Sequence, residues 1–492
     1  MSPDPPSLAG YPATRGDEVV APSGALRDAA RALAPLLGRP DLIELAAAAS
    51  ATFGSCGGGI AVRRDGRPAV RAVPVDPVPR PIDRRSWSAL SAGVAQRHRA
   101  LDAFLADVYR ASGRRRSDPD RAPEIVRAGA LPEWAVVGSP GHDPAAVGMA
   151  WPSQRRIGLL GCDVVRTDDG RWLVRADDAR RPAGLGPALS LRRAIASAAP
   201  ALLPPEDVAD PADALPLLRA ALDAAAPPAC AGRPEVAVLR SADLPSPPGE
   251  DAALATALDV PLVAPSDLWP RVDGGIAAAV DGRRLPVDVL HLRLDDAELA
   301  ASRTPAGQTV GALLGEAVRG GRLGLVNVPG NALADEPTTF AGVPAMIRFY
   351  LGEEPLLEQV PTWVLADGPQ WAEVRDRLHE LVVVPMAAYG GGPTVVGPEC
   401  TPTELAELQA QVAAAPHRFI ARAVVVPSTA PALGAGRLLP RALDLRVFSA
   451  ASGRDRVEVL DAPLTRVAVG EGASDVDLAA GAAVKDTWLL PG

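Results

Sequence analysis

Short apolar segments alternate with helical segments between residues 233 and 330. Helices are predicted at 250–258 and 308–319, and the segments between and around them read as strands: PEVAVLR, VPLVAP, VDVLHLRL and LGLVNVPG. Strands that alternate with helices form a parallel sheet, because each return crossing needs a connecting helix. The sequence therefore predicts an α/β protein with a Rossmann-like sheet in this region.

The length of the chain predicts several domains. A chain of 492 residues is longer than one hydrophobic core normally supports. Changes in composition and period divide it into five predicted segments: a flexible tail at 1–24, a mainly helical region at 25–135, a hairpin with helices at 136–230, the Rossmann-like domain at 231–330, and mixed strands and helices at 331–492.

Composition and charge exclude several classes of protein. The net charge of −9 argues against a sequence-independent nucleic-acid binder, which needs a basic excess. The apolar runs break before the ~18 residues that a membrane span requires. The N-terminus lacks a signal-peptide pattern, and the four cysteines form no CxxC pair. We expect a cytoplasmic protein with neither a nucleic-acid nor a membrane partner.

The segment GCDVVRTDDGRWLVRADDARRPAG, at 161–184, reads as a β-hairpin. Strands are predicted at 155–165 and 171–177, and Asp169-Gly170 supplies the turn. The pattern continues with an acidic cluster and then Arg-x-Pro-x-Gly.

This pattern resembles the metal-binding hairpin of ATP-grasp ligases. In that family an Asp on the first strand, and a Glu and an Asn two residues apart on the second, ligate magnesium between the phosphates of ATP. Such a site needs hard oxygen donors on one strand face, which residues i and i+2 share. The resemblance implies Asp163 and Asp178 as metal ligands, whereas the Glu position is Ala176.

The hairpin precedes the Rossmann-like segment, an order that is the signature of the circularly permuted ATP-grasp family. Later blocks of that family are matched in order by VDVLHLRLDD, LVNVPGNALADE, MIRFYLGEEPLL, LPRALDLRVF, LTRVAV and VKDTWLL. The resemblance covers about residues 25–490. It implies a circularly permuted ATP-grasp fold with a Rossmann-like pre-ATP-grasp domain and an N-terminal helical segment, and it implies ATP and Mg as cofactors.

The chain departs from the family where nucleotide is bound. Two lysines that contact nucleotide in the family are Val384 and Pro337 here, and a Gln before the adenine-side strand is Arg422. A Lys beside ATP neutralises phosphate charge, which Val and Pro cannot do.

The charged and glycine residues that remain are assigned by the resemblance to three roles. The candidate catalytic residues are Arg446, Lys485 and Arg180. The candidate cofactor-binding residues are Gly390, Gly391, Gly392, Arg441, Arg466, Arg293 and Asp295, with Asp444 as a further acidic member of the set. Simpler interpretations stay open. Asp444 and Arg446 share a strand face and can pair with each other, as can Asp178 and Arg180, and the glycine run can be a tight turn.

Lys485 is the only lysine among the 50 Lys and Arg residues. It lies in the block VKDTWLL, where the resemblance implies a lysine that contacts phosphate. Chance in an arginine-rich composition is the alternative.

Two hypotheses of function follow. The favoured one is a degenerate family member that kept the fold, lost catalysis, and serves as a binding or scaffold protein. The alternative is a divergent ATP-dependent carboxylate–amine ligase that forms an amide through an acyl-phosphate. Loss of the metal-binding Glu and of both lysines favours the first, because removing one catalytic electrostatic group already costs ~10²–10³ in rate. The family also implies a partner, either an all-helical-domain protein or a transglutaminase-like protein.

Overall fold

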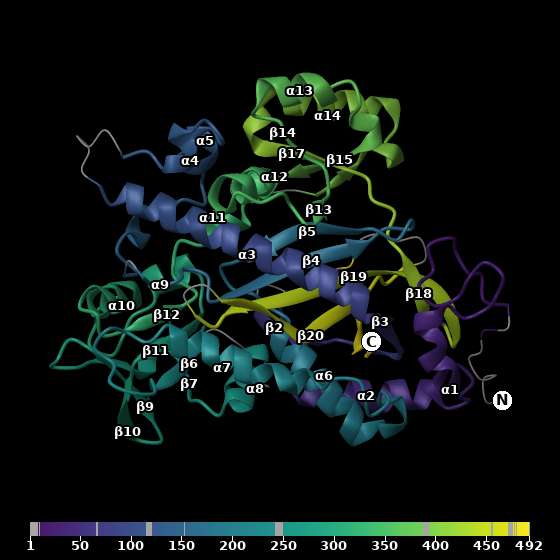
Figure 1. Cartoon of the computed structure of the whole chain (residues 1–492), viewed down its shortest axis with the longest axis horizontal. Helices are drawn as coiled ribbons and strands as arrows, with labels where there is room; N and C mark the ends of the chain where they lie inside the picture. Colours follow the sequence, from purple (N-terminus) through teal and green to yellow (C-terminus); the bar gives the residue numbers. More distant parts are fainter. Residues whose placement is uncertain are drawn as a thin grey trace.

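The computed structural model describes the chain except for residues 1–7, 9, 65–66, 115–120, 152, 242–248, 387–392, 454–455, 471–475, 477, 479 and 492, and except for the side chains of 61–69. Figure 1 shows a large central sheet, a small lobe above it and a second α/β lobe beside it. Within the described residues, no helix combines the length and the apolar character that crossing a membrane requires.

The central sheet has eight strands in the order β13-β5-β4-β19-β20-β21-β3, with β18 paired to β19. The predicted hairpin forms its β4 and β5, so strands from four distant parts of the chain meet in one sheet. The strands are β3 (Val75–Ile82), β4 (Leu159–Arg166), β5 (Trp172–Asp178), β13 (Glu358–Gln359), β18 (Thr429–Gly434), β19 (Arg437–Ala451), β20 (Val457–Val467) and β21 (Ala483–Leu489).

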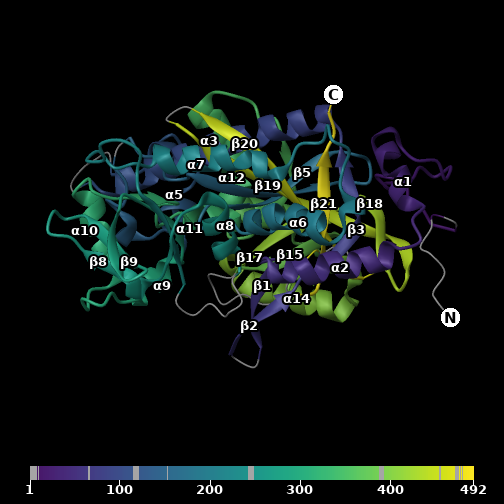
Figure 2. The same ribbon diagram turned by 90° about the horizontal axis from the view of Figure 1, so that it is seen from below.

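Helices cover both faces of the central sheet (Figures 1 and 2). Leu445 and Val447 of β19 pack in the cluster that includes residues of α3 (Arg84–Ser112). Phe448 and Ala450 pack on the opposite face, in the cluster that holds α2 (Leu42–Ser55), α6 (Leu185–Ala198) and α7 (Leu215–Ala224). This alternation follows from the two-residue period of a strand. It places Asp444 and Arg446 on the face toward α6.

The Rossmann-like sheet predicted between 233 and 330 is confirmed. Its four strands are all parallel, in the order β12-β11-β6-β7, and a three-stranded antiparallel sheet, β10-β9-β8, lies next to it in sequence. The elements are β6 (Val236–Arg240), α8 (Glu250–Leu258), β7 (Leu262–Val263), β8 (Leu268–Pro270), β9 (Ile276–Val280), β10 (Arg283–Val287), β11 (Val289–Arg293), α9 (Asp296–Ala301), α10 (Val310–Arg319) and β12 (Gly324–Val326).

His291 on β11 is buried in this parallel sheet, and its burial makes folding sensitive to pH. Its Nδ1 lies 2.9 Å from the carbonyl oxygen of Val326, and burial, reinforced by the charge of Arg293, lowers its pKa to about 4. The unfolded chain binds a proton near pH 6.5 that the folded protein does not. We therefore expect His291 to contribute stability above pH 6.5 and to lose about 2 kcal/mol of it by pH 5.

Denaturant unfolding at pH 7.5 and at pH 5 measures this loss. His291→Gln keeps a hydrogen-bond donor but cannot titrate, so its stability is expected to fall less than that of the wild type between the two pH values. His379→Gln, at an exposed position, is the matched control. An equal fall for wild type and His291→Gln would contradict the assignment.

The small lobe is a four-stranded antiparallel sheet in the order β14-β17-β15-β16, with its own hydrophobic core (Figure 1). Val384 lies on β15, opposite Ile420, and Arg422 lies on the central strand β17. The elements are β14 (Thr362–Val364), α13 (Gly368–Val374), β15 (Leu381–Pro385), β16 (Val395–Val396), α14 (Pro402–Ala414) and β17 (Phe419–Ala423).

The N-terminal part corrects two predictions. Within the segment predicted as a flexible tail, Val19 and Val20 are buried, and Glu18 forms an ion pair with buried Arg80 at 2.6 Å. The proline-rich stretch 74–83, within the region predicted as mainly helical, is largely strand β3, an edge strand parallel to β21. Proline is tolerated at a sheet edge because one side of the strand needs no hydrogen-bond donors.

The remaining elements are short apart from α12. Strand β20 runs without a break from Val457 to Val467, and α12 is followed by a π-helical turn at Ile347–Leu351. The elements are α1 (Ala34–Leu37), β1 (Gly59–Arg64), β2 (Arg67–Ala72), α4 (Glu124–Arg127), α5 (Glu133–Val136), α11 (Ala332–Asp335) and α12 (Pro337–Met346).

Candidate functional site

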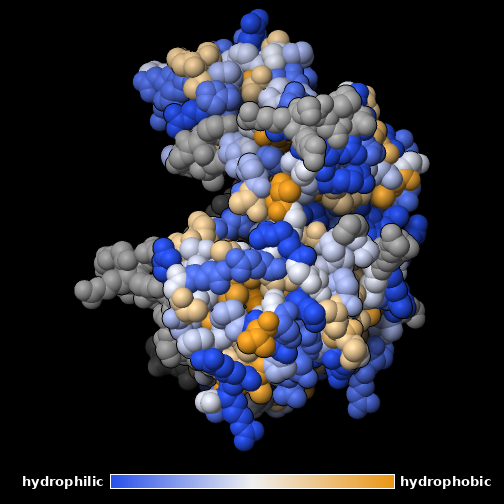
Figure 3. Space-filling model, turned by 90° about the vertical axis from the view of Figure 1, so that its left-hand side faces the viewer, coloured by the Kyte–Doolittle hydropathy of each residue, from blue (hydrophilic) through white to orange (hydrophobic). Residues whose placement is uncertain are grey.

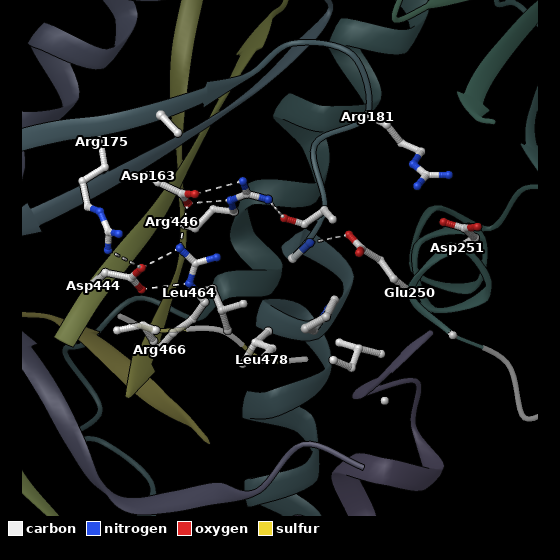
Figure 4. Close-up of a pocket in the computed structure, with 18 of the residues that line it drawn as sticks. Asp163, Arg175, Arg181, Glu250, Asp251, Asp444, Arg446, Leu464, Arg466 and Leu478 are labelled. Carbon is white, nitrogen blue, oxygen red and sulfur yellow. Dashed lines mark hydrogen bonds and ion pairs between the residues drawn. The ribbon is translucent and has the colours of Figure 1, made fainter. Parts of the chain in front are cut away.

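A cavity of about 600 Å³ lies against the α6 face of the central sheet. Three walls form it, and Figure 4 shows Asp163 and Arg446 on one side of the cavity and Glu250 and Asp251 on the other. One comes from β4, β5, β19 and β20, a second from the start of α8 and the end of β11, and the third from β17 of the small lobe. The charged residues that line it are Asp163, Arg175, Arg181, Glu250, Asp251, Arg293, Arg422, Asp444, Arg446 and Arg466.

Asp163 is held by two arginines from neighbouring strands. Arg446 lies directly opposite it in the β4–β19 register, and its Nε and Nη2 donate to the two carboxylate oxygens at 2.7 and 3.2 Å. Arg466 Nη2 approaches Oδ1 at 3.0 Å. Burial alone would raise the pKa of Asp163, but the two guanidinium groups hold it well below its usual range. Asp163 is therefore a carboxylate at neutral pH with both oxygens engaged.

Asp444 and Asp178 are held in the same way. Arg466 donates to both oxygens of Asp444 at 2.8 and 2.6 Å, across the β19–β20 register, so Asp444 pairs with Arg466 and not with Arg446 on its own strand. Asp178 Oδ2 accepts from Arg446 Nη1 at 3.3 Å, and its Oδ1 accepts from the backbone NH of Arg181 at 3.1 Å. Figure 4 shows Asp163, Asp444, Arg446 and Arg466 forming one continuous ion-pair network along the wall.

These residues do not fit a magnesium ion. Mg²⁺ needs oxygen ligands in near-octahedral geometry, whereas the oxygens of Asp163 and Asp178 already accept hydrogen bonds. Ala176, which lies opposite Asp163 and also lines the cavity, has no oxygen to offer from its side chain. Among the described residues, no group of three or more His, Cys, Asp or Glu could hold a metal ion.

In the small lobe, Arg422 brings a positive charge to the cavity, whereas the positions of the family's two nucleotide-contacting lysines do not. Val384 and Pro337, at the positions of the two lysines, bring no charge, and Pro337 begins helix α12. The predicted phosphate loop residues Gly390, Gly391 and Gly392 lie outside the described residues.

The second wall is a separate ion-pair cluster centred on Arg293. This buried arginine donates to Asp251 at 2.7 Å and to the carbonyl oxygen of Pro182 at 2.6 Å, and it lies 3.4 Å from Glu250. Burial lowers the pKa of Arg293, but the two carboxylates outweigh that effect and raise it. Arg293 was predicted to bind cofactor; it lines the cavity, but its charge is already paired.

Five predicted residues are absent from the cavity lining: Asp178, whose contacts are given above, and four others. Lys485 is fully buried and pairs with Asp76 of β3. Asp295 caps helix α9 by accepting from the NH of Glu298. Arg441 faces the β18 side of the sheet, opposite Ala430. Arg180 Nε lies 3.7 Å from Asp335 Oδ2. Arg180 therefore pairs with Asp335 and not with Asp178, the partner considered from the sequence.

Four charged cavity residues were not predicted from the sequence: Arg175, Arg181, Glu250 and Asp251. The register of the hairpin places Asp163 opposite Ala176 and Val164 opposite Val174, so residue 175 is an extra residue at a bulge. The bulge allows Arg175 and Ala176 to line the same cavity. Glu250 and Asp251 occupy the first turn of α8, where acidic residues are common for reasons of helix stability, so no sequence signal separated them.

A central sheet with paired carboxylates, a small antiparallel lobe and a cavity between them define an ATP-grasp protein. A model of the family described as circularly permuted ATP-grasp type 2 matches residues 79–468, and the chain belongs to this family. The fold and the family predicted from the sequence are both confirmed.

Two relatives of the chain carry the names of ligases, and a third is an uncharacterised protein. The chain is 41% identical over 478 residues to a putative glutamate–cysteine ligase 2-3 of Frankia alni, which covers 96% of this chain and 53% of the relative. A putative glutamate–cysteine ligase 2-2 of Frankia casuarinae is 38% identical, covering 99% and 55%. The chain thus spans about half the length of these curated relatives. An uncharacterised protein of Mycobacterium leprae is 35% identical over 422 residues, covering 85% of this chain and 72% of the relative.

One solved structure supports the fold. A glutathione synthetase-like effector from Globodera pallida, in its apo form, matches with a TM-score of 0.50 at 14% identity, over 91% of this chain and 97% of that one.

Proposed function

We propose that this chain is a ligase-like family member that has lost magnesium-dependent ATP binding and ligation and acts as a binding or scaffold protein. The observation that carries the proposal is the state of Asp163: two arginines occupy its oxygens, and Ala176 stands opposite it. A divalent cation at this place would have to displace both guanidinium groups from a partly buried carboxylate. The loss of charge at Val384 and Pro337 supports the same conclusion from the nucleotide side.

The alternative is a divergent ATP-dependent carboxylate–amine ligase. The names of the Frankia relatives favour it, as does a cavity of about 600 Å³ that still presents carboxylates and arginines. In this alternative the arginines would exchange Asp163 and Asp178 for the phosphates of the nucleotide. The presence of a charged cavity alone does not distinguish the two proposals, so binding must be measured.

Titration of Mg-ATP into the protein by calorimetry is the test. We expect no heat of binding at millimolar nucleotide, because the metal ligands are closed and the two lysine positions are neutral. Circular dichroism of the same sample checks that the protein is folded. Mg-ATP binding that Asp163→Asn abolishes and Arg437→Gln preserves would support the ligase instead; Arg437 is exposed and does not line the cavity.

A binding role requires a partner. By analogy with other family members, we propose an all-helical-domain protein or a transglutaminase-like protein, encountered in the cytoplasm.

A further inference from the structure

Arg422 differs from the other arginines of the cavity in having no counter-ion. It lies on β17, the central strand of the small lobe, and lines the cavity. Its Nε is buried without a hydrogen-bond partner, and no hydrogen bond or ion pair of its side chain is found among the described residues. The guanidinium groups in the other two walls of the cavity are paired with carboxylates. The lack of such a partner at Arg422 therefore needs an explanation.

A second arginine adds to the positive electrostatic potential around Arg422. Burial, and then the charge of Arg175 from the central sheet, lower the pKa of Arg422 to about 10, which still leaves it protonated at neutral pH. Arg175 itself lies 3.9 Å from Asp444, a carboxylate that already accepts two hydrogen bonds from Arg466. Two sheets therefore direct cations at one cavity, and the acidic groups nearby are committed to other arginines.

The side chain of Arg422 is also held in place. Its Cζ lies 5.3 Å from the centre of the Phe340 ring, against which Arg97 also packs at 4.9 Å. An aromatic ring supports a guanidinium group without using its NH donors. The donors at the edge of Arg422 consequently stay available to a ligand.

Among the described residues that line the cavity, arginines outnumber carboxylates. Six arginines and four carboxylates line the cavity, and three of the arginines, Arg293, Arg446 and Arg466, are paired to those four carboxylates. Of the remaining three, Arg181 lies 3.7 Å from Glu298 and Arg175 makes the contacts described above. Within the described part of the chain, Arg422 is thus a lining arginine for which no counter-ion is found.

We propose that the cavity binds a small organic anion without a metal ion, and that Arg422 pairs with its carboxylate or phosphate group. A guanidinium edge is suited to either group, because both accept two parallel hydrogen bonds. This proposal rests on the proposed function, since a metal-free anion takes the space that Mg-ATP would need. It adds that the cavity binds a metal-free anion in place of Mg-ATP.

Calorimetry in buffer freed of metal by a chelating resin tests the proposal, with inorganic pyrophosphate and citrate as the two probes. We expect at least one probe to bind, and Arg422→Gln to weaken its affinity tenfold or more, because a charge-assisted pair is lost. Arg422→Lys is expected to restore part of the affinity, and Arg437→Gln to leave it unchanged. Whichever probe binds identifies the anionic group.

A second measurement separates a ligand-binding role from a structural one. Because Arg422 has no counter-ion in the free protein, Arg422→Gln is expected to keep or raise the thermal unfolding temperature without anion and to remove the rise that the probe causes in wild type. Binding that Arg422→Gln leaves unchanged, or no binding of either probe to the folded protein, would overturn the proposal. These outcomes are independent of the Mg-ATP titration, which alone decides the loss of the nucleotide site.

Discussion

Replacing Lys485 with Met is expected to lower the free energy of unfolding by about 3–5 kcal/mol. The Lys485 ammonium is fully buried and donates to Asp76 and to the carbonyl oxygens of Val78 and Pro431, the latter two at 2.8 and 2.7 Å. Methionine preserves the volume and removes the charge. It leaves a buried carboxylate without its cation and two carbonyl oxygens without a donor. Chemical denaturation at neutral pH measures the effect.

The same contacts explain why an arginine-rich chain has one lysine. Three acceptors surround a compact ammonium that has three donors, so every donor is used. A planar guanidinium is larger and needs a different arrangement of acceptors, and we expect Lys485→Arg to destabilise the protein by about 1–3 kcal/mol through overpacking. The opposite result would be a Lys485→Met protein that is as stable as wild type but has lost affinity for Mg-ATP. That result would show that Lys485 contacts phosphate, as the resemblance implies.

Lys485 illustrates what could be predicted from the sequence and what could not. Its position in a block that resembles the family supported the family assignment, which is confirmed. Its partner, Asp76, is about 400 residues away in sequence, on an edge strand within the region predicted as mainly helical. Sequence periodicity identifies local elements, but the register between distant strands decides whether a charged side chain faces a cavity or a core.

The candidate site likewise combines features that local sequence patterns predict with features that depend on strand register. The hairpin, the parallel sheet and helix α8 follow from local patterns and were predicted close to their observed bounds. The pairing of Asp444 with Arg466, and not with Arg446, depends on the β19–β20 register. The position of Arg175 depends on a bulge that adds one residue to β5, for which the sequence carries no glycine or other marker.

Figure 3 shows that polar side chains predominate on one face of the molecule and that this face is hollowed below its uppermost part. Exposed charges are common on this face, so the buried charges are more informative about the function. A buried ion pair contributes little net stability when complete and costs much when one partner is removed. This asymmetry allows stability measurements to separate ion-pair members from metal ligands.

Asp163→Asn is accordingly expected to lower the free energy of unfolding by about 2–4 kcal/mol in metal-free buffer. The amide cannot compensate the two guanidinium groups, Arg446 and Arg466, that the carboxylate now holds. Asparagine preserves the shape of the side chain, so the loss reports on charge and not on packing. Arg437→Gln serves as the exposed control, with an expected change close to zero.

The sign of this change distinguishes the two functions. In a metal site without its metal, carboxylates repel one another, and neutralising one of them relieves that repulsion and stabilises the free protein. In an arginine-filled site, the carboxylate is itself the compensating charge, and neutralising it destabilises the protein. Because the arginines hold the pKa of Asp163 below its usual range, wild type should also lose stability as pH falls below about 4, and Asp163→Asn should lose less. An Asp163→Asn protein that is as stable as wild type, or more stable, and that has lost Mg-ATP binding would show that Asp163 is a metal ligand and that the chain retains the ligase site.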